Sequence, residues 1–249
     1  MTATPAARPW LLLSWLMLLL PPLSLFIGNI QLFPLLDLSS SFANLNYAIT
    51  MTGTRPWGIL SSAIVLLLLW WQLPKQQRLP VVVATLIALG LNLLLSHGLK
   101  NLFQESRPYV EYLAQKGVLN LSQFYAVDSA GRGAILNALS PSNLPLPLSP
   151  QVWQQWQFET GYSFPSGHTL FSCTLALSIC YALLPQRKWV LPLLVICWAW
   201  WVSLSRILLG MHWPRDVLAS ALLSGVIVLL SFALVKFWQR RKLTRRDPA

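Results

Sequence analysis

Three short polar clusters, each at the end of an apolar stretch, contain the residue types that could bind a phosphate group and attack it. Their members are Lys100 and Arg107, then Ser166, Gly167 and His168, then Arg206, His212 and Asp216. Ionisable groups at the ends of apolar helices are costly unless they have a use, and only 10% of this chain is charged. The recurrence of cations, histidines and a carboxylate therefore predicts a phosphate site.

The local sequence of two clusters suits an anion. Ser166 is a good helix N-cap, and Gly167 permits close approach of the backbone, so free N–H groups at that helix start could bind phosphate. Pro214 suits the first turn of a helix. We therefore expect His212 at the cap and Asp216 one turn further along, within reach of the imidazole.

These residue types predict a reaction in which the two histidines have different roles. A carboxylate that is hydrogen-bonded to one ring nitrogen leaves the lone pair of the other nitrogen exposed, which predicts His212 as a nucleophile. His168 lies beside the anion-binding turn and can protonate a leaving oxygen. The three cations, Lys100, Arg107 and Arg206, would neutralise the non-bridging oxygens.

Six apolar, charge-free runs must position these clusters. The chain has 249 residues, of which 55% are hydrophobic, and the runs cover 9–36, 56–74, 79–99, 160–186, 189–205 and 217–235. A helix needs about 20 apolar residues to cross a membrane, and continuous runs are unlike the alternation of a membrane barrel. We predict an all-α polytopic membrane protein with six transmembrane helices. The apolar region of the first run is longer than that of a signal peptide, and no small-x-small cleavage site follows it, so we expect a retained helix.

The basic residues predict the orientation in the membrane. Arg8, residues 75–78, Arg187 with Lys188, and the tail 236–246 share one side of the alternating helices, which the positive-inside rule assigns to the cytoplasm. All three clusters then meet on the outer side. We predict one domain over 1–249, in a bacterial inner membrane. Both termini are expected in the cytoplasm, with a periplasmic helical cap at 101–163 between the third and fourth helices.

The remaining charged residues indicate which classes of partner and cofactor we expect for the protein. The net charge of +11 comes mainly from the cytoplasmic helix ends, so it predicts topology and no nucleic-acid partner. No obligate protein partner is evident. Among the seven acidic residues only Asp216 and Glu105 lie close to the clusters, and two histidines make a poor zinc site, so we expect no metal and no cofactor. Glu105 and Glu159 are expected as surface or ion-pairing groups of the cap.

The three clusters together resemble the signature of the type 2 phosphatidic acid phosphatase family. The matching segments are Lys100 with Arg107-Pro108, Pro165-Ser166-Gly167-His168, and Ser205-Arg206 with His212 and Asp216. The resemblance implies a six-helix membrane bundle and metal-independent hydrolysis of a lipid phosphate through a phosphohistidine. It implies His212 as nucleophile, Asp216 as its partner, and His168 as acid and then base. The implied phosphate cradle is Lys100, Arg107, Ser166, Gly167 and Arg206.

The implied substrates are membrane lipids with a terminal phosphate or pyrophosphate: phosphatidylglycerophosphate, phosphatidic acid, diacylglycerol pyrophosphate and undecaprenyl pyrophosphate. Two other functions use the same residues. A phosphotransferase would pass the phosphoryl group to a second lipid, and a non-catalytic protein would only bind or move anionic lipids. The two histidines and Asp216 argue against the latter. Vanadate-dependent haloperoxidases share the signature, but they are typically soluble, whereas this chain has six apolar runs.

Overall fold

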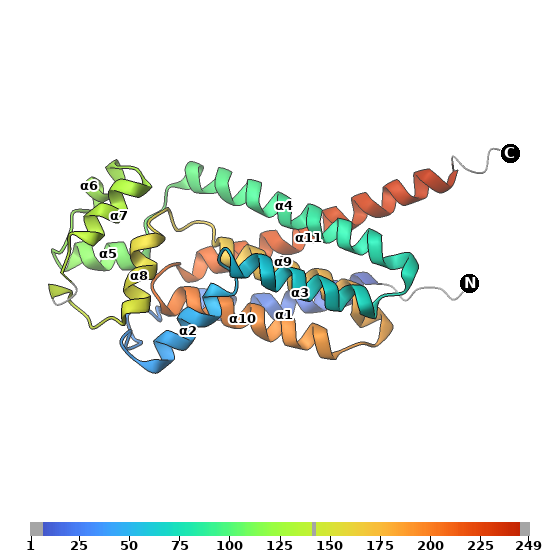
Figure 1. Ribbon diagram of the computed structural model, residues 1–249, viewed down its shortest axis with the longest axis horizontal. Coiled ribbons are helices and arrows are strands. Elements are labelled where there is room, and N and C mark those ends of the chain that lie inside the picture. The colour runs from blue at the N-terminus through green and yellow to red at the C-terminus, as the bar shows by residue number, and fades with distance from the viewer. Residues whose placement is uncertain (1–6, 141–142, 245–249) are drawn as a thin grey trace.

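Long helices lying side by side form the body of the protein, and a group of short helices covers one end (Figure 1). The computed structural model describes residues 7–140 and 143–244, and this part of the chain is helical with no β-strand. The all-α prediction is thus confirmed. Arg245 and Arg246 of the predicted basic tail lie outside the described residues. Within them, α1 begins and α11 ends at the end opposite the short helices.

Each of the six apolar runs contains one helix. They are α1 (Ala7–Ile27), α3 (Trp57–Gln72), α4 (Lys75–Phe103), α9 (Gly167–Leu183), α10 (Val190–Leu208) and α11 (Pro214–Thr244). In the described chain five of them, all except α3, are long and apolar enough to cross a membrane. The 16 residues of α3 extend only about 24 Å at 1.5 Å per residue, against a hydrocarbon core of about 30 Å.

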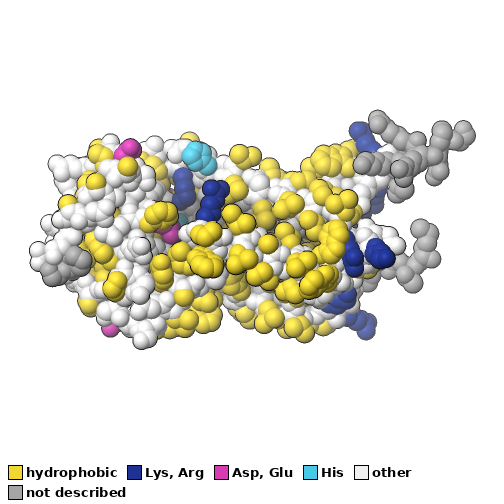
Figure 2. All heavy atoms as spheres, in the orientation of Figure 1, with side chains coloured by type: hydrophobic (Ala, Val, Ile, Leu, Met, Phe, Trp, Pro, Cys, Tyr) yellow, Lys and Arg dark blue, Asp and Glu magenta, His cyan; other side chains and the backbone are white. Residues whose placement is uncertain are grey.

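The surface of the long helices is apolar. Large hydrophobic side chains such as Leu12, Ile59, Leu94 and Leu230 are exposed on four of them, and hydrophobic side chains cover the middle of the face seen in Figure 2. A water-soluble monomer seldom exposes an apolar area of this extent, whereas a helix in lipid must do so. The chain is therefore a membrane protein.

The central helix is α9, which packs against α1, α4, α10 and α11. Polar groups of α9 form hydrogen bonds with neighbouring helices inside the bundle. The amide of Asn92 in α4 donates to the Thr174 hydroxyl and, at 3.3 Å, to the Leu170 carbonyl, which also accepts from Ser224 of α11 at 3.2 Å. Interhelical hydrogen bonds of this kind hold membrane helices in register, because lipid offers no competing partner.

Helix α1 packs closely on α11 at Gly225. A Cβ atom added to Gly225 would lie 2.0 Å from the Trp15 ring, and the Trp15 indole donates to the Ala221 carbonyl at 2.8 Å. Only glycine leaves room for this indole. The contact ties the first helix of the chain to the last.

Replacing Gly225 with Ala should therefore destabilise the bundle by roughly 1–3 kcal/mol, because the Trp15 ring must move out of a packed interface. The measurement is the thermal unfolding temperature in detergent micelles. Gly90→Ala is the matched control, since nothing lies within 4 Å of its added Cβ. Equal unfolding temperatures for the two variants would show that Trp15 does not constrain position 225.

The segment between α4 and α9, which contains most of the range 101–163 predicted as a helical cap, folds into short helices. They are α5 (Pro108–Gln115), α6 (Leu121–Ala126), α7 (Ser129–Asn137) and α8 (Pro150–Phe158). The side chains of Asn120, Asp128 and Ser149 cap the last three by accepting a backbone N–H three residues on. A further helix, α2 (Ser41–Met51), lies in a region expected to be loop, and a 3-10 turn, η2 (Leu184–Gln186), follows α9.

The short helices have a hydrophobic core of their own, separate from that of the long helices. Tyr109, Leu113, Phe124 and Trp156 are fully or almost fully buried in it, and Met211 from the turn before α11 packs among them. The group of short helices is thus anchored to the end of the bundle at which the predicted site lies.

Candidate active site

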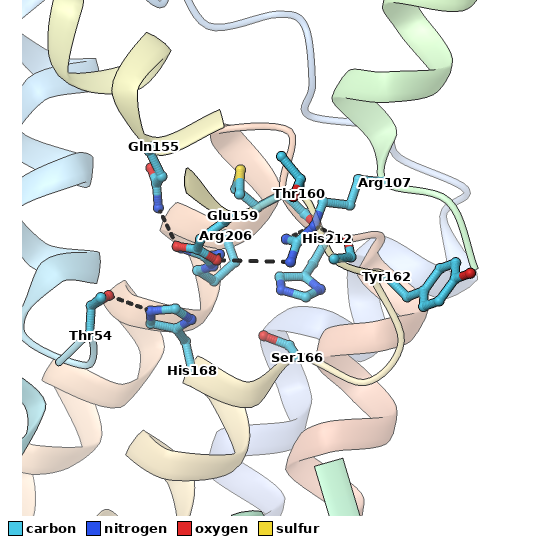
Figure 3. A network of polar contacts seen from close by, with 12 residues as sticks. Thr54, Arg107, Gln155, Glu159, Thr160, Tyr162, Ser166, His168, Arg206 and His212 are labelled. Carbon is cyan, nitrogen blue, oxygen red and sulfur yellow. Dashed lines mark hydrogen bonds and ion pairs between the residues drawn. The ribbon is translucent and has the colours of Figure 1, made fainter. Parts of the chain in front are cut away.

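The predicted site residues come together where the long helices meet the short ones (Figure 3). Arg107 precedes α5, His168 is the second residue of α9, Arg206 lies in the last turn of α10, and His212 lies in the turn before α11. Segments more than a hundred residues apart in the sequence therefore share one site, as the alternation of helix direction predicts.

The turn between α10 and α11 brings His212 back beside Arg206. Gly210 has a φ of 71°, and the amides of Gly210 and Met211 donate to the carbonyls of Ile207 and Arg206 at 3.1 and 3.0 Å. This pattern is the Schellman helix end, which requires a left-handed residue. The His212 amide donates to the same Arg206 carbonyl at 3.1 Å, so the backbone fixes the spacing of the two residues.

The short helices hold this turn from the other side. The Gly210 carbonyl accepts from the Tyr109 amide at 2.9 Å, and the Met211 carbonyl accepts from Nη1 of Arg107 at 3.0 Å. Arg107 is almost completely buried. Its guanidinium therefore stabilises the turn that contains His212 and is also a cation in the site.

The contact between His212 and Asp216 differs in detail from the prediction. Because Pro214 is the first residue of α11, Trp213 takes the cap position, and His212, which was expected at the cap, lies one residue before it. Oδ2 of Asp216 accepts from the Trp213 amide at 3.0 Å, as in a capping box. Nδ1 of His212 lies 3.6 Å from the same oxygen, within ion-pair range but beyond a hydrogen bond.

Two buried atoms at this contact remain unpaired. Nδ1 of His212 and Oδ1 of Asp216 have no hydrogen-bond partner among the described residues. Because Nδ1 faces the carboxylate, Nε2 is the ring nitrogen that is left for a ligand. A small rotation of either side chain would form the hydrogen bond that the sequence predicts.

A carboxylate lies between the two arginines of the site. Nη1 of the fully buried Arg206 donates to Oε1 of Glu159 at 3.2 Å and to the Thr50 hydroxyl at 2.9 Å, while Nη2 pairs with Oε2. Nη2 of Arg107 is 3.9 Å from that oxygen. Burial raises the pKa of the Glu159 carboxyl, but the attraction of the nearby cations, Arg206 foremost, outweighs it and leaves this pKa well below its usual range.

The sequence did not place Glu159 within the phosphate site. Its predicted ion pairing is confirmed, but its side chain is only 16% exposed and lies inside the site. Glu105 forms the surface ion pair that was predicted for it, because its carboxylate accepts from Arg215 at 2.9 Å. The stretches before Glu105 and Glu159 have no regular period. The sequence therefore carries no signal that separates Glu159, which lies inside the site, from Glu105, which lies at the surface.

Two predicted cradle cations hold the loop that leads into α9. Nε of Arg107 donates to the Gly161 carbonyl at 2.7 Å, and Nζ of Lys100 donates to the next carbonyl, that of Tyr162. The loop then reaches Ser166, the predicted N-cap of α9, whose hydroxyl accepts from the Thr169 amide at 3.4 Å. The capping prediction is confirmed.

The start of α9 is open to a ligand at Gly167. A Cβ added there would meet only the Ser96 hydroxyl, at 3.6 Å, an ordinary van der Waals distance. The packing of the protein itself therefore does not require glycine at this position. Binding of an anion by the N–H groups at the positive end of α9 stays a prediction.

His168 has a partner that the sequence did not predict. Oγ1 of Thr54 lies 2.7 Å from its Nε2, so Nδ1 is the nitrogen left to exchange a proton. Thr50 lies in the last turn of α2, which packs against α10, whereas Thr54 lies three residues after that helix ends. No helical spacing in the sequence therefore marks Thr54.

The surroundings keep His212 neutral. Burial, followed by the positive charges of Arg107 and Arg206, lowers the pKa of His212 well below its ordinary value of 6.5. Near neutral pH the imidazole therefore carries no proton on one nitrogen. An uncharged imidazole beside two guanidinium groups is suited to attack an anionic phosphate that those groups hold.

This shift predicts how stability depends on pH. Unfolded His212 takes up a proton below pH 6.5 and the folded form does not, so lowering the pH favours unfolding. The native protein should lose up to about 1.4 kcal/mol per pH unit below 6.5 relative to the His212→Asn variant, which cannot titrate there. Thermal unfolding of both proteins between about pH 7.5 and 5.5 measures this. Parallel curves would show that His212 is not held neutral.

The described residues contain no group of three or more His, Cys, Asp or Glu side chains that could hold a metal ion. The elements predicted to bind phosphate are cations, a helix start and a hydroxyl group.

Comparison with known proteins identifies the family. Residues 81–240, which include every predicted site residue, match the family model of the PAP2 superfamily. The chain belongs to this superfamily. The resemblance carried by the three sequence clusters is thereby confirmed.

Two of the following relatives are similar over most of the chain, and the third is similar over a shorter part of it. Phosphatidylglycerophosphatase B of Escherichia coli K12 is 33% identical over 189 residues, which cover 74% of this chain and 72% of that protein. Phosphatidylglycerophosphatase B of Haemophilus influenzae is 34% identical over 207 residues, 76% of this chain and 80% of that protein. The undecaprenyl-diphosphatase of Sulfolobus acidocaldarius is 46% identical over 72 residues, 29% of this chain and 33% of that protein.

Proposed function

We propose that this PAP2 protein is an integral membrane phosphatase that hydrolyses the phosphomonoester or pyrophosphate of a lipid through a phosphohistidine at His212. The observation that carries the proposal is the meeting of a buried, neutral His212 with Asp216, His168 and two guanidinium groups (Figure 3). The names of its relatives favour phosphatidylglycerophosphate as substrate, converted to phosphatidylglycerol. Phosphatidic acid, diacylglycerol pyrophosphate and undecaprenyl pyrophosphate are further candidates.

In the first step, Nε2 of His212 attacks phosphorus and the bond from phosphorus to the lipid oxygen breaks. Asp216 stabilises the positive charge that develops on the ring, 3.6 Å from Nδ1. His168 donates a proton from Nδ1 to the departing oxygen, which leaves as the lipid alcohol or lipid phosphate. In the second step, His168 takes a proton from water, the water oxygen attacks phosphorus, and the phosphorus–nitrogen bond breaks to release inorganic phosphate.

The cations stabilise the charge on the transferring phosphoryl group. Nε of Arg206 is buried with no partner among the described residues, which leaves a donor for a phosphate oxygen. Glu159 serves as the resident counter-ion of Arg206 while the site is empty and keeps the guanidinium group oriented. When a phosphate binds, it competes with this carboxylate for the same donors.

A lipid substrate fits an apolar recess beside the site. A cavity of about 390 Å³ lies between α2 and α3, with Met51, Thr52 and Leu60 among its lining residues. Thr52 lies two residues before Thr54, the partner of His168.

We propose that α3 completes a sixth crossing by tilting or by local thinning of the bilayer. Both termini then lie in the cytoplasm and the site faces the periplasm of a bacterial inner membrane, as the basic residues predict.

Thr54→Val should lower kcat by roughly 5- to 20-fold, because one hydrogen bond that orients His168 is lost while the side-chain shape is retained. KM should change little, since Thr54 does not hold the phosphate. Steady-state kinetics on detergent-solubilised protein measures both constants. A rise in KM at constant kcat would instead assign Thr54 to substrate binding.

The proposed function is tested by phosphate release from purified protein with a chelator present. Phosphatidylglycerophosphate, phosphatidic acid and undecaprenyl pyrophosphate are supplied separately, with the His212→Asn variant as control. Metal-free release that depends on His212 supports the lipid phosphatase. Loss of substrate without free phosphate, and with a newly phosphorylated lipid, would support the phosphotransferase. Binding of substrate without turnover would support the non-catalytic alternative.

A further inference from the structure

A second cavity, of about 840 Å³, lies far from the catalytic residues, between α1, α4, α9 and α11. On α9 it is lined by Tyr181 and Ala182, which follow His168 by about 20 Å of helix. On α11 it is lined between Leu229 and Arg240, well beyond Asp216. The cavity therefore lies at the end of the bundle where α1 begins and α11 ends (Figure 1).

The cavity is amphipathic. Its walls include Val81, Leu229 and the contacting rings of Tyr181 and Phe232, whose centroids are 4.3 Å apart. Its outer part carries the cations Arg8, Lys236 and Arg240. Lys and Arg side chains gather at this end in Figure 2, and none of the described residues that line the cavity is acidic.

Shape and charge together select the ligand. The volume is within the range of about 300–1,000 Å³ typical of sites that enclose a small amphiphile. Apolar walls favour a hydrocarbon chain over a soluble anion, and cations from two helices favour a negative headgroup over a zwitterion. Among the lining residues, Gln186 donates to Gln77 at 3.2 Å.

We propose that this cavity binds one anionic phospholipid from the membrane leaflet opposite the catalytic residues. The headgroup phosphate lies against the three cations, and an acyl chain lies along Tyr181 and Phe232. The lipid joins α4, α9 and α11, whose other ends carry Lys100, His168 and Asp216, so it stabilises the bundle that positions the active site. This ligand is distinct from the substrate and does not react.

The proposal is tested on the delipidated full-length protein in neutral detergent at constant ionic strength. Dioleoyl phosphatidylglycerol is titrated while native mass spectrometry counts bound lipid and thermal unfolding reports its effect. We expect Lys236→Gln to weaken binding about fivefold, the loss expected for one cation near a headgroup. Ala233→Trp, which fills the cavity without changing charge, should weaken binding more than tenfold. Arg187→Gln, at an exposed cation of the same end outside the cavity, should leave affinity within twofold.

Three controls make the outcome decisive. Dioleoyl phosphatidylcholine should bind at least fivefold more weakly, and glycerophosphoglycerol, the headgroup without chains, should not raise the unfolding temperature. Variants that unfold at the native temperature without lipid are folded, so a change in affinity reports on the cavity. Equal affinity for the two lipids, stabilisation by the headgroup alone, or unchanged affinity in both Lys236→Gln and Ala233→Trp would overturn the proposal.

Discussion

Replacing His212 with Asn should reduce phosphate release by about 10⁴-fold or more, the loss typical when a nucleophile is removed. Asn retains a polar atom near the position of Nδ1, 3.6 Å from Asp216 in the native protein, so the turn before α11 should keep its shape. The nitrogen that would bond to phosphorus is absent. The measurement is kcat/KM with phosphatidic acid and with phosphatidylglycerophosphate, and both substrates should be affected equally.

The third histidine provides a matched control. His97 is exposed on α4, one turn before Lys100, and its Nε2 lies 3.3 Å from the side-chain amide of Asn101. His97→Asn should change kcat/KM by less than about twofold, as expected for a surface substitution. If His212→Asn kept more than about one-hundredth of the native rate, water would have to attack directly and His212 would not be the nucleophile.

Arg206→Lys should lower kcat/KM by roughly 10²- to 10³-fold, the cost of removing one charge-stabilising donor from a site of this kind. Lysine keeps the charge but cannot contact Thr50, Glu159 and a phosphate oxygen together, as the planar guanidinium can. Arg206 is fully buried, so stability should also fall, by about 1–3 kcal/mol for the lost hydrogen bonds. Kinetics and thermal unfolding are both measured.

Arg215→Lys is the comparison for that variant. Arg215 lies next to Asp216 in sequence, is 55% exposed and pairs with Glu105 on the surface. Surface pairs contribute at most about 1 kcal/mol, so both activity and unfolding temperature should stay close to the native values. A similar loss in both variants would mean that the effect at position 206 is not specific to the buried guanidinium of the site.

The long helices could be read from the sequence because a helix that faces lipid must be apolar along its whole length. All six runs contain a helix, but the run 56–74 yields only the 16 residues of α3. Helix α2 was not predicted, since Ser41–Met51 mixes polar and apolar residues without a strong period. Its position depends on packing against α10 and α8, which no local pattern records.

The residues of the candidate site could be predicted from the sequence, and the residues that support them could not. Histidine, arginine and a Ser-Gly helix start have recognisable chemistry, so the three clusters predicted which residues the fold brings together. Glu159 and Thr54 are common residue types, and only the fold brings them to Arg206 and His168. The offset of His212 from the helix start arises because the Pro214 ring occupies the first helical position and Trp213 takes the cap.

The most direct test of the account is to find the phosphoryl group on His212. Purified protein is mixed with phosphatidic acid labelled in its phosphate, with a chelator present, and is denatured in alkaline detergent. The His168→Asn variant is run in parallel over a longer incubation, because loss of this acid and base should slow both formation and release of the group by about 10²- to 10⁴-fold. We expect label that is stable in base, lost in acid, and confined to the peptide containing His212. Release of phosphate with no labelled protein in either sample, or label on another residue, would contradict it.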